Sequence, residues 1–233
     1  MQRRCAGLGP AEVRDKAGAL VAVEGMKIDR ISHIAAGGRR YTIPVTAPGG
    51  RRWGHFASLS AVHIMGRAIA DISRLEAPGA PKTTYNVGVA HGGTTVNAIA
   101  PGAEMPVDMR SVDIHGRADL ERRVLGVVEP AANEGNGKVA LDVVGDRPAG
   151  SIPATHPVVD TGKTVHRVPG LRTFTEVSST DANAAPGAGR PGACPNITEG
   201  ASEHRLDGHL EAGPFPTGVK HILPVTVAPA GKV

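Results

Sequence analysis

Glu24 and His204 belong to the 22 acidic residues and 10 histidines of the chain, residue types that can hold metal ions or transfer protons. Glu24 ends the apolar run 19–23, which reads as a short strand, and His204 lies in the polar stretch 203–207. Carboxylates and imidazoles are frequent zinc ligands and frequent proton-transfer groups. From the residues alone, Glu24 is also explained as a surface carboxylate at a strand terminus, and that alternative stays open.

Three further polar positions could bind a substrate. Arg110 carries a planar guanidinium, which can grip a carboxylate through two parallel hydrogen bonds, although Asp108 could instead make it half of an ion pair. Asn97 suits a turn, and the polar run 178–183 before a helix makes a good N-cap. Each position therefore has a structural explanation beside the functional one.

The stretch 85–111 is central to the elements that must position these residues. Two runs in it show the alternation of half-buried strands, first at Val87 and Val89 and then at Met105, Val107 and Met109. The residues 91–93, His-Gly-Gly, interrupt the first run, because glycine tolerates positive φ in turns and bulges. We expect two strands joined by a bend.

Segments on both sides of this stretch complete a recurring order. A hairpin over 28–48 supplies a strand at 39–46, a helix follows over 61–75, and a second helix over 119–128 precedes a β-rich run at 138–144. The order strand, helix, strand, strand, helix, strand predicts the ferredoxin-like split βαβ arrangement.

Three prolines set expected limits on these elements. Pro44 lacks an amide donor, so its strand should lie at an edge or carry a local break there. Pro130 should end the second helix, and Pro224 should interrupt a closing helix that begins near residue 218. Between them, residues 156–168 suggest a further helix and 173–177 a further strand.

The string GGTTVNAIAP, followed by a strand that ends VDMRS, resembles the lid domain of a known family. This is the zinc-dependent exopeptidase and amidohydrolase family that includes aminoacylase, glutamate carboxypeptidase and peptidase T. The resemblance implies an α/β (α+β) fold, with a ferredoxin-like lid of a four-stranded antiparallel sheet and two helices joined to a partial α/β zinc-exopeptidase-like domain. It divides the chain into the end of the first catalytic part (1–27), the dimerisation lid (28–148) and the C-terminal catalytic part (149–233).

The same resemblance implies roles for individual residues. Glu24 and His204 occupy metal-ligand positions. Substrate-binding positions fall on Asn97, Arg110, Arg147, Ser179 and Thr180. A histidine that reaches the partner subunit's active site in the family is replaced here by Arg51.

The activity implied is amide hydrolysis of peptides or N-acyl amino acids at a two-zinc site. A metal-bound water and a positioned carboxylate supply the nucleophile and the base for this reaction. Only Glu24 and His204 of the family ligands are found, they serve different ions in the family, and the residues before the first strand cannot supply the rest. We therefore expect this chain to be incomplete and inactive by itself. The alternative is a non-catalytic dimerisation or binding module built on the ferredoxin-like lid.

Charge and composition limit the classes of partner that we expect this chain to bind. The net charge of +4 is spread over scattered arginine pairs, which argues against nucleic-acid binding. Two cysteines are too few for a disulfide framework, and we expect no membrane span, no signal peptide and a cytoplasmic location. The family resemblance adds the expectation of a homodimer through the lid.

Overall fold

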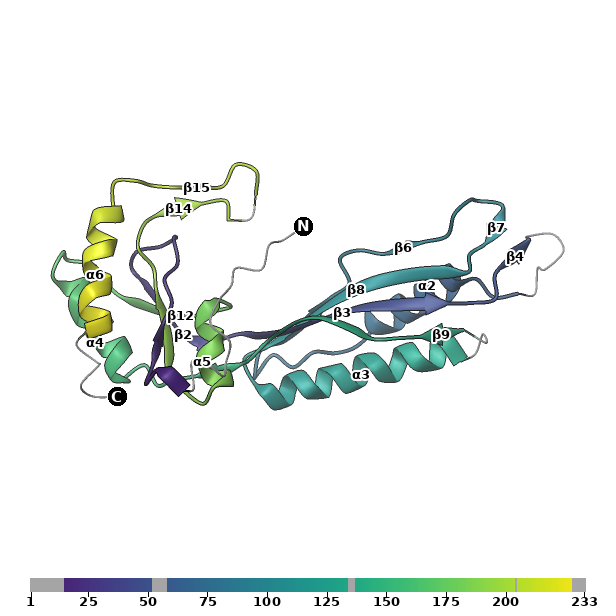
Figure 1. Ribbon diagram of the computed structural model, residues 1–233, viewed down its shortest axis with the longest axis horizontal. Coiled ribbons are helices and arrows are strands. Elements are labelled where there is room, and N and C mark those ends of the chain that lie inside the picture. Colours follow the sequence, from purple (N-terminus) through teal and green to yellow (C-terminus); the bar gives the residue numbers. More distant parts are fainter. Residues whose placement is uncertain (1–14, 52–57, 134–136, 204, 228–233) are drawn as a thin grey trace. The chain divides into compact units, whose positions relative to one another are not determined.

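The chain divides into two units in this computed structural model, which describes residues 15–51, 58–133, 137–203 and 205–227. Unit 1 comprises residues 1–36 and 147–233, and unit 2 comprises residues 37–146 (Figure 1). The sequence prediction placed the lid at 28–148.

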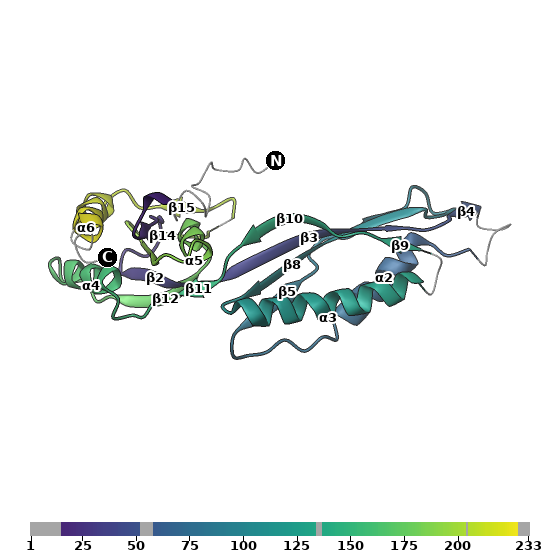
Figure 2. The same cartoon turned by 60° about the horizontal axis from the view of Figure 1, so that its bottom comes forward.

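Unit 2 is built on an antiparallel sheet with the strand order β10-β3-β8-β5. These strands are β3 (Gly37–Thr46), β5 (Thr83–Asn86), β8 (Gly102–Ser111) and β10 (Asp142–Arg147). Helices α2 (Ala61–Ile72) and α3 (Ile114–Asn133) lie on one face of the sheet (Figure 2). Numbered along the chain, the strands follow the order 4-1-3-2, and the predicted ferredoxin-like arrangement is confirmed.

The core of unit 2 forms between the sheet and the two helices, because alternate strand residues and one face of each helix carry apolar side chains. Ile43, Met105 and Met109 are fully buried, and they pack with Ile64 and Leu120 from the two helices. The buried face of α2 consists of Ala61, Ile64, Met65, Ala68 and Ile72, and His63 is exposed outside it.

Four short strands extend the ladders of unit 2: β4 (Gly50–Arg51), β6 (His91–Gly92), β7 (Ala98–Ile99) and β9 (Lys138–Val139). The pair β4–β7 forms its own small ladder, whereas β6 pairs with β8 and β9 pairs with β3. The expected first run differs from the structure: Val87 and Val89 lie outside the strands, and His91–Gly92, expected as an interruption, form β6. Only Gly93, with φ of +76°, has the turn conformation expected there.

Two prolines of unit 2, Pro44 and Pro106, lie inside central strands, each beside a gap in the neighbouring strand. The carbonyl of Pro44 accepts a hydrogen bond from the Ala140 amide (3.1 Å), so its donor-less nitrogen faces the interval between β9 and β10. On β8, the carbonyl of Gly102 accepts from Gly93, so Pro106 has the same outward direction and faces the interval between β5 and β6. The expectation for the Pro44 strand is wrong, because β3 is a central strand that runs unbroken through Pro44; the gap lies in the neighbouring strand instead.

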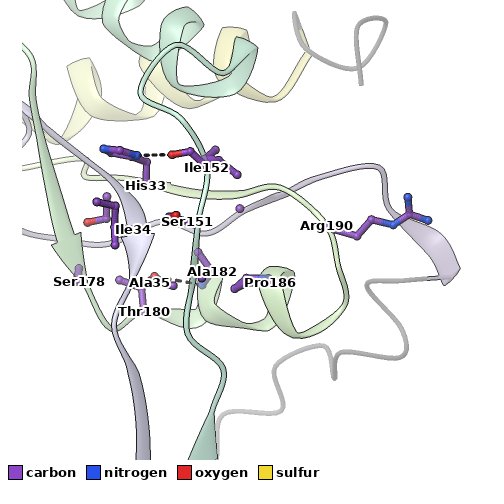
Figure 3. A pocket seen from close by; sticks show the side chains of 13 residues that line it. His33, Ile34, Ala35, Ser151, Ile152, Ser178, Thr180, Ala182, Pro186 and Arg190 are labelled. Carbon is purple, nitrogen blue, oxygen red and sulfur yellow. Dashed lines mark hydrogen bonds between the residues drawn. The ribbon is translucent and has the colours of Figure 1, made fainter. Parts of the chain in front are cut away.

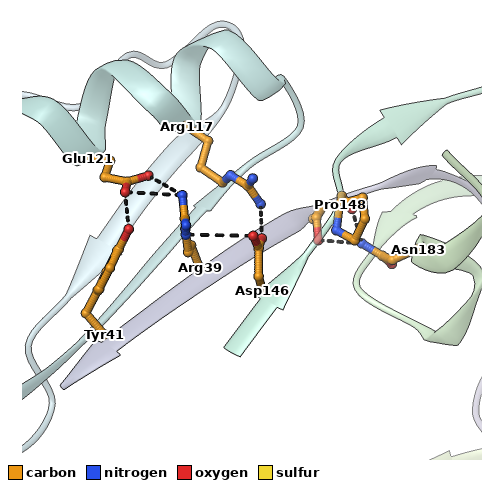
Figure 4. A network of polar contacts seen from close by, with 8 residues as sticks. Arg39, Tyr41, Arg117, Glu121, Asp146, Pro148 and Asn183 are labelled. Atoms are coloured by element: carbon orange, nitrogen blue, oxygen red, sulfur yellow. Dashed lines mark hydrogen bonds and ion pairs between the residues drawn. The ribbon is translucent and has the colours of Figure 1, made fainter. Parts of the chain in front are cut away.

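A polar network joins α3 to the sheet of unit 2 (Figure 4). Glu121 accepts hydrogen bonds from the Tyr41 hydroxyl and from Arg39 Nη1, and Asp146 pairs with Arg39 and with Arg117 (2.9 Å). Burial, followed by the hydrogen bond to Glu121, raises the pKa of Tyr41 to about 12. The phenol is therefore neutral at physiological pH.

Unit 1 contains a mixed sheet of the order β1-β13-β2-β11, with β12 also paired to β2. Its strands are β1 (Leu20–Val21), β2 (Arg30–Ala35), β11 (Gly150–Ser151), β12 (Phe174–Ser178) and β13 (Gly192–Pro195). β14 (Gly200–Ala201) and β15 (His209–Leu210) form a separate hairpin. Cys194 on β13 is fully buried, and burial raises the pKa of its thiol to about 12.

Helices α4 (Pro157–Arg167) and α6 (Phe215–Val227) pack together in unit 1, where the short η1 (Asp181–Asn183) and α5 (Ala184–Gly187) follow β12. His166 of α4 and His221 of α6 are both buried, with ring centroids 5.1 Å apart. His166 Nδ1 lies 2.9 Å from the Thr173 hydroxyl, and within the described structure Nδ1 of His221 is buried without a hydrogen-bond partner. No helix in the described part of the chain is long and apolar enough to cross a membrane.

Three further local expectations are wrong. The hairpin over 28–48 does not form, because β2 pairs with β11, β12 and β13 while β3 pairs with β8. Helix α3 continues through Pro130, and α6 continues through Pro224. Gly126, four residues before Pro130, is exposed, so water can hydrate the carbonyl that loses its helical donor.

Candidate substrate-binding cavity

Parallel pairing with β13 fixes the position of Glu24. The amide of Glu24 donates to the Pro195 carbonyl (3.3 Å), and its carbonyl accepts from the Ile197 amide (3.0 Å). An isolated bridge pairs Glu24 with Asn196. The carboxylate thus stands at the end of the strand run, as the sequence predicted.

The turn after β12 is held by a capping box. The Thr180 hydroxyl accepts from the Ala182 amide (3.2 Å), and the Thr180 amide donates to Asn183 Oδ1 (2.9 Å). Asn183 is buried, and its Nδ2 donates to the carbonyls of Ala36 and Pro148, both at 2.9 Å (Figure 4). Three hydrogen bonds through one amide side chain fix the backbone of this turn.

Glu24 and the turn residues Ser179 and Thr180 line one cavity of about 480 Å³ in unit 1. This volume suits a small organic ligand. Further polar and charged residues also line it: Lys27, Glu176, Asn196, Glu203, Arg205 and His209. Carboxylates and cations on the same wall suit a ligand that itself carries both charges.

Among the lining residues that sequence analysis missed are Glu176, Glu203, Arg205 and His209. Glu176 lies within β12, where it accepts hydrogen bonds from Arg30 and Ser32 (each 3.3 Å). The other three come from the β14–β15 hairpin and its connection, and their only sequence signal was their closeness to His204.

A second hollow in unit 1 has room for little more than one water molecule, at about 20 Å³ (Figure 3). His33 Nδ1 lies 2.7 Å from the Ile152 carbonyl at its border, which makes Nδ1 the donor and leaves Nε2 as the acceptor. This hollow is too small for a peptide or an acyl amino acid.

The donor set does not fit a two-zinc site. Within the described ranges, no group of three or more His, Cys, Asp or Glu side chains lies close enough to hold a metal ion. Glu24 lines the cavity, while His204 lies outside the described residues. Since a zinc ion takes about four ligands, the described residues do not form such a site by themselves.

The other predicted substrate residues lie apart from this set. In unit 2, Asn97 is exposed, its amide donates to the Thr95 hydroxyl (3.3 Å), and Arg110 Nε donates to Asp108. Arg51 pairs in the β4–β7 ladder with Ala98, the residue after Asn97. Arg147 of unit 1 lies 3.8 Å from the Asp181 carboxylate.

Part of the chain matches the model of a known protein family. Residues 53–136 match the family model of the peptidase dimerisation domain. A comparison with curated proteins finds no match.

Solved structures match nearly all of the chain. A tripeptidase from Staphylococcus aureus is 20% identical with a TM-score of 0.80, covering 95% of this chain and 60% of its own. The aminopeptidase PepT from Bacillus cereus is 18% identical with a TM-score of 0.78, covering 93% and 60%. A hydantoinase/carbamoylase family amidase from Burkholderia vietnamiensis is 18% identical with a TM-score of 0.70, covering 92% and 55%.

The expected resemblance to this exopeptidase and amidohydrolase family is confirmed, together with the α/β fold class. The chain spans no more than 60% of the length of these three structures.

Proposed function

We propose that this chain, with its peptidase dimerisation domain and the fold of peptidase and amidase structures, is the lid and C-terminal part of an amide-bond hydrolase. Its substrates are peptides or N-acyl amino acids. The observation that carries the proposal is the cavity of unit 1, where the strand-end carboxylate Glu24 and the turn Ser179–Thr180 share one wall. The match of residues 53–136 to a dimerisation domain supports a homodimer formed through unit 2.

In this proposal the chain's own residues bind and orient the substrate. The rigid turn offers its backbone and hydroxyls to the ligand, because Asn183 holds it from behind. Arg205 and Lys27 attract a carboxylate end, and Glu24, Glu176 and Glu203 attract an amine end.

The 233 residues do not turn over substrate unaided in this proposal. The described donors do not form a metal centre, and no step of hydrolysis is assigned to them. Arg51 stands where the family's trans histidine acts, and loss of one oxyanion donor costs about 10²–10³ in rate. The second candidate, a non-catalytic dimerisation or binding module, is favoured by these same two observations.

The test is hydrolysis of a panel of dipeptides and N-acyl amino acids by the purified chain, with and without added zinc or cobalt. We expect no turnover, zinc far below two ions per chain by plasma emission, and dipeptide binding that Thr180→Val weakens. Glu129→Ala, at an exposed site in unit 2, serves as the matched control. Turnover lost in both Glu24→Ala and His204→Ala would show that these residues assemble a working site. Absence of any ligand binding would favour the module instead.

A further inference from the structure

A buried amide side chain connects the cavity turn to both segments through which the chain leaves and re-enters unit 1. The chain leaves this unit after Ala36 and returns to it at Arg147. Asn183, which is 2% exposed, donates from Nδ2 to the carbonyls of Ala36 and Pro148, both at 2.9 Å (Figure 4). Its Oδ1 accepts from the amide of Thr180 in the turn (2.9 Å). The donor and the acceptor groups of this side chain are therefore both engaged.

The outgoing segment is held at both of its backbone groups. The Ala36 carbonyl accepts from Asn183, and the Ala36 amide donates to the Ser178 carbonyl (2.9 Å). Ser178 ends β12 and lines the cavity beside Thr180. The residue at which the chain leaves unit 1 is thus bonded to both ends of the cavity turn.

The returning segment packs against the helix that follows the turn. A Cβ added at Gly150 would overlap with Cβ of Pro186, so this segment lies directly on α5. On β13, a Cβ added at Gly192 would lie 2.7 Å from Cβ of Ala185. The hollow at this junction has room for about one water molecule (Figure 3). Segments packed with so little free space shift together, not one at a time.

We propose that Asn183 is a positioning residue that makes the cavity turn and the two connecting segments one cooperative unit. Loosening the turn releases Ala36 and Pro148, and a ligand that orders Ser179 and Thr180 orders these two residues as well. Occupancy of the cavity is thereby linked to the order of both connections. The effect of a ligand rests on the proposed function, whereas the cooperative unit does not.

The experiment is amide hydrogen exchange of the whole isotope-labelled chain, followed by NMR at neutral pH. Thr180→Val removes the hydroxyl that accepts from the Ala182 amide, and so loosens the turn. We expect the protection of the residue 180 amide and of the Ala36 amide to fall by the same factor, about fivefold, because the two open together. The amide of Leu171, which donates to the His166 carbonyl elsewhere in unit 1, should keep its protection.

Asn183→Ala removes the link between the turn and the connections. In that background Thr180→Val should still lower the protection of residue 180 but should not lower that of Ala36 further, so the double-mutant cycle measures the coupling. The matched control is Thr175→Val, the same change at an exposed site on β12, which should alter neither amide. If Asn183→Ala does not fold, the two amides of the Thr180→Val chain still decide the proposal.

A second arm adds saturating alanylalanine to the parent chain and to Asn183→Ala. The dipeptide should raise the protection of residue 180 and of Ala36 by one common factor in the parent, and should leave Ala36 unchanged in the variant. Unequal responses of the two amides to Thr180→Val, a response of Ala36 that survives Asn183→Ala, or a bound dipeptide that protects residue 180 without Ala36 would each overturn the proposal.

The two arms separate this proposal from the hydrolase. A dipeptide that does not bind counts against the proposed function, and the first arm, which contains no ligand, then decides the role of Asn183 by itself. Failure of the first arm leaves the hydrolase proposal standing.

Discussion

At the scale of single residues, burial lowers the pKa values of two neighbouring histidines, His166 and His221. Burial, with His221 nearby as the second cause, lowers the pKa of His166 from 6.5 to about 4, while Asp29 acts in the opposite direction. Burial also lowers the pKa of His221. Both imidazoles are therefore neutral in the folded protein at physiological pH.

We predict that unit 1 loses stability as the pH falls from 6.5 towards 4. The folded pKa of His166 is depressed, so the unfolded chain binds more protons in this window and the stabilisation present above pH 6.5 is lost. The full effect of His166 is about 3 kcal/mol. Hydrogen exchange of α4 and α6 against pH measures it.

His166→Gln keeps a partner for Thr173 and should flatten this pH dependence. His63→Gln, at an exposed site on α2, should not change it. A pH profile that is identical in His166→Gln and in the parent chain would contradict the prediction.

At the scale of elements, a central strand can contain a proline because the direction of its backbone hydrogen bonds alternates along the strand. Pro44 and Pro106 each point their nitrogen at a gap in the neighbouring strand, so no ladder bond is lost. At these two gaps the proline nitrogen also offers no N–H donor with which the backbone of another chain could pair.

We predict that Pro106→Thr changes the unfolding free energy by no more than about 0.5 kcal/mol, since the new amide faces no strand. Val107→Pro, one residue on, removes an amide that faces β3 and should cost more than about 2 kcal/mol. Urea midpoints of the two variants make the comparison. A larger loss in Pro106→Thr would show that the register argument is wrong.

Local pattern predicted the elements of unit 2 well because its strands and helices pair with near neighbours in a recurring order. It failed for β2, whose partner β12 lies more than 140 residues away, so nothing near residues 30–35 announces the pairing. Glu24 and the turn at Ser179 could be identified from the family resemblance. Arg205 and His209 could not, because only the folded hairpin brings them to the cavity.

At the scale of the whole molecule, assembly is the property that the dimerisation-domain match raises most directly. Unit 2 presents an edge strand, β10, with Val143 and Val144 each about half exposed. An exposed edge strand is a ready site for pairing with a second copy, and the two valines lie between the charged residues Asp142 and Asp146.

We predict a homodimer by light scattering at tens of micromolar. Val144→Lys should shift it towards the monomer, because a charge on the edge strand opposes pairing. Val96→Lys, at a site in unit 2 that is 94% exposed, is the control and should leave the dimer intact. A folded parent chain that is monomeric at these concentrations would rule out the homodimer.

The buried thiol of Cys194 on β13 can report how often unit 1 opens, because only the opened unit exposes it to an alkylating reagent. The chain's tyrosines and its tryptophan, Tyr41, Trp53 and Tyr85, all fall within residues 37–146. Tyrosine and tryptophan fluorescence therefore does not report on unit 1. Cys194 is shielded and its thiol pKa is about 12, so alkylation requires that unit 1 first open.

In a Cys5→Ser background, we predict an iodoacetamide labelling rate limited by that opening. The rate should rise on acidification to pH 5 once it is corrected for thiolate content, and His166→Gln should remove the rise. Labelling as fast as that of a free peptide thiol would show that the shielding is not real.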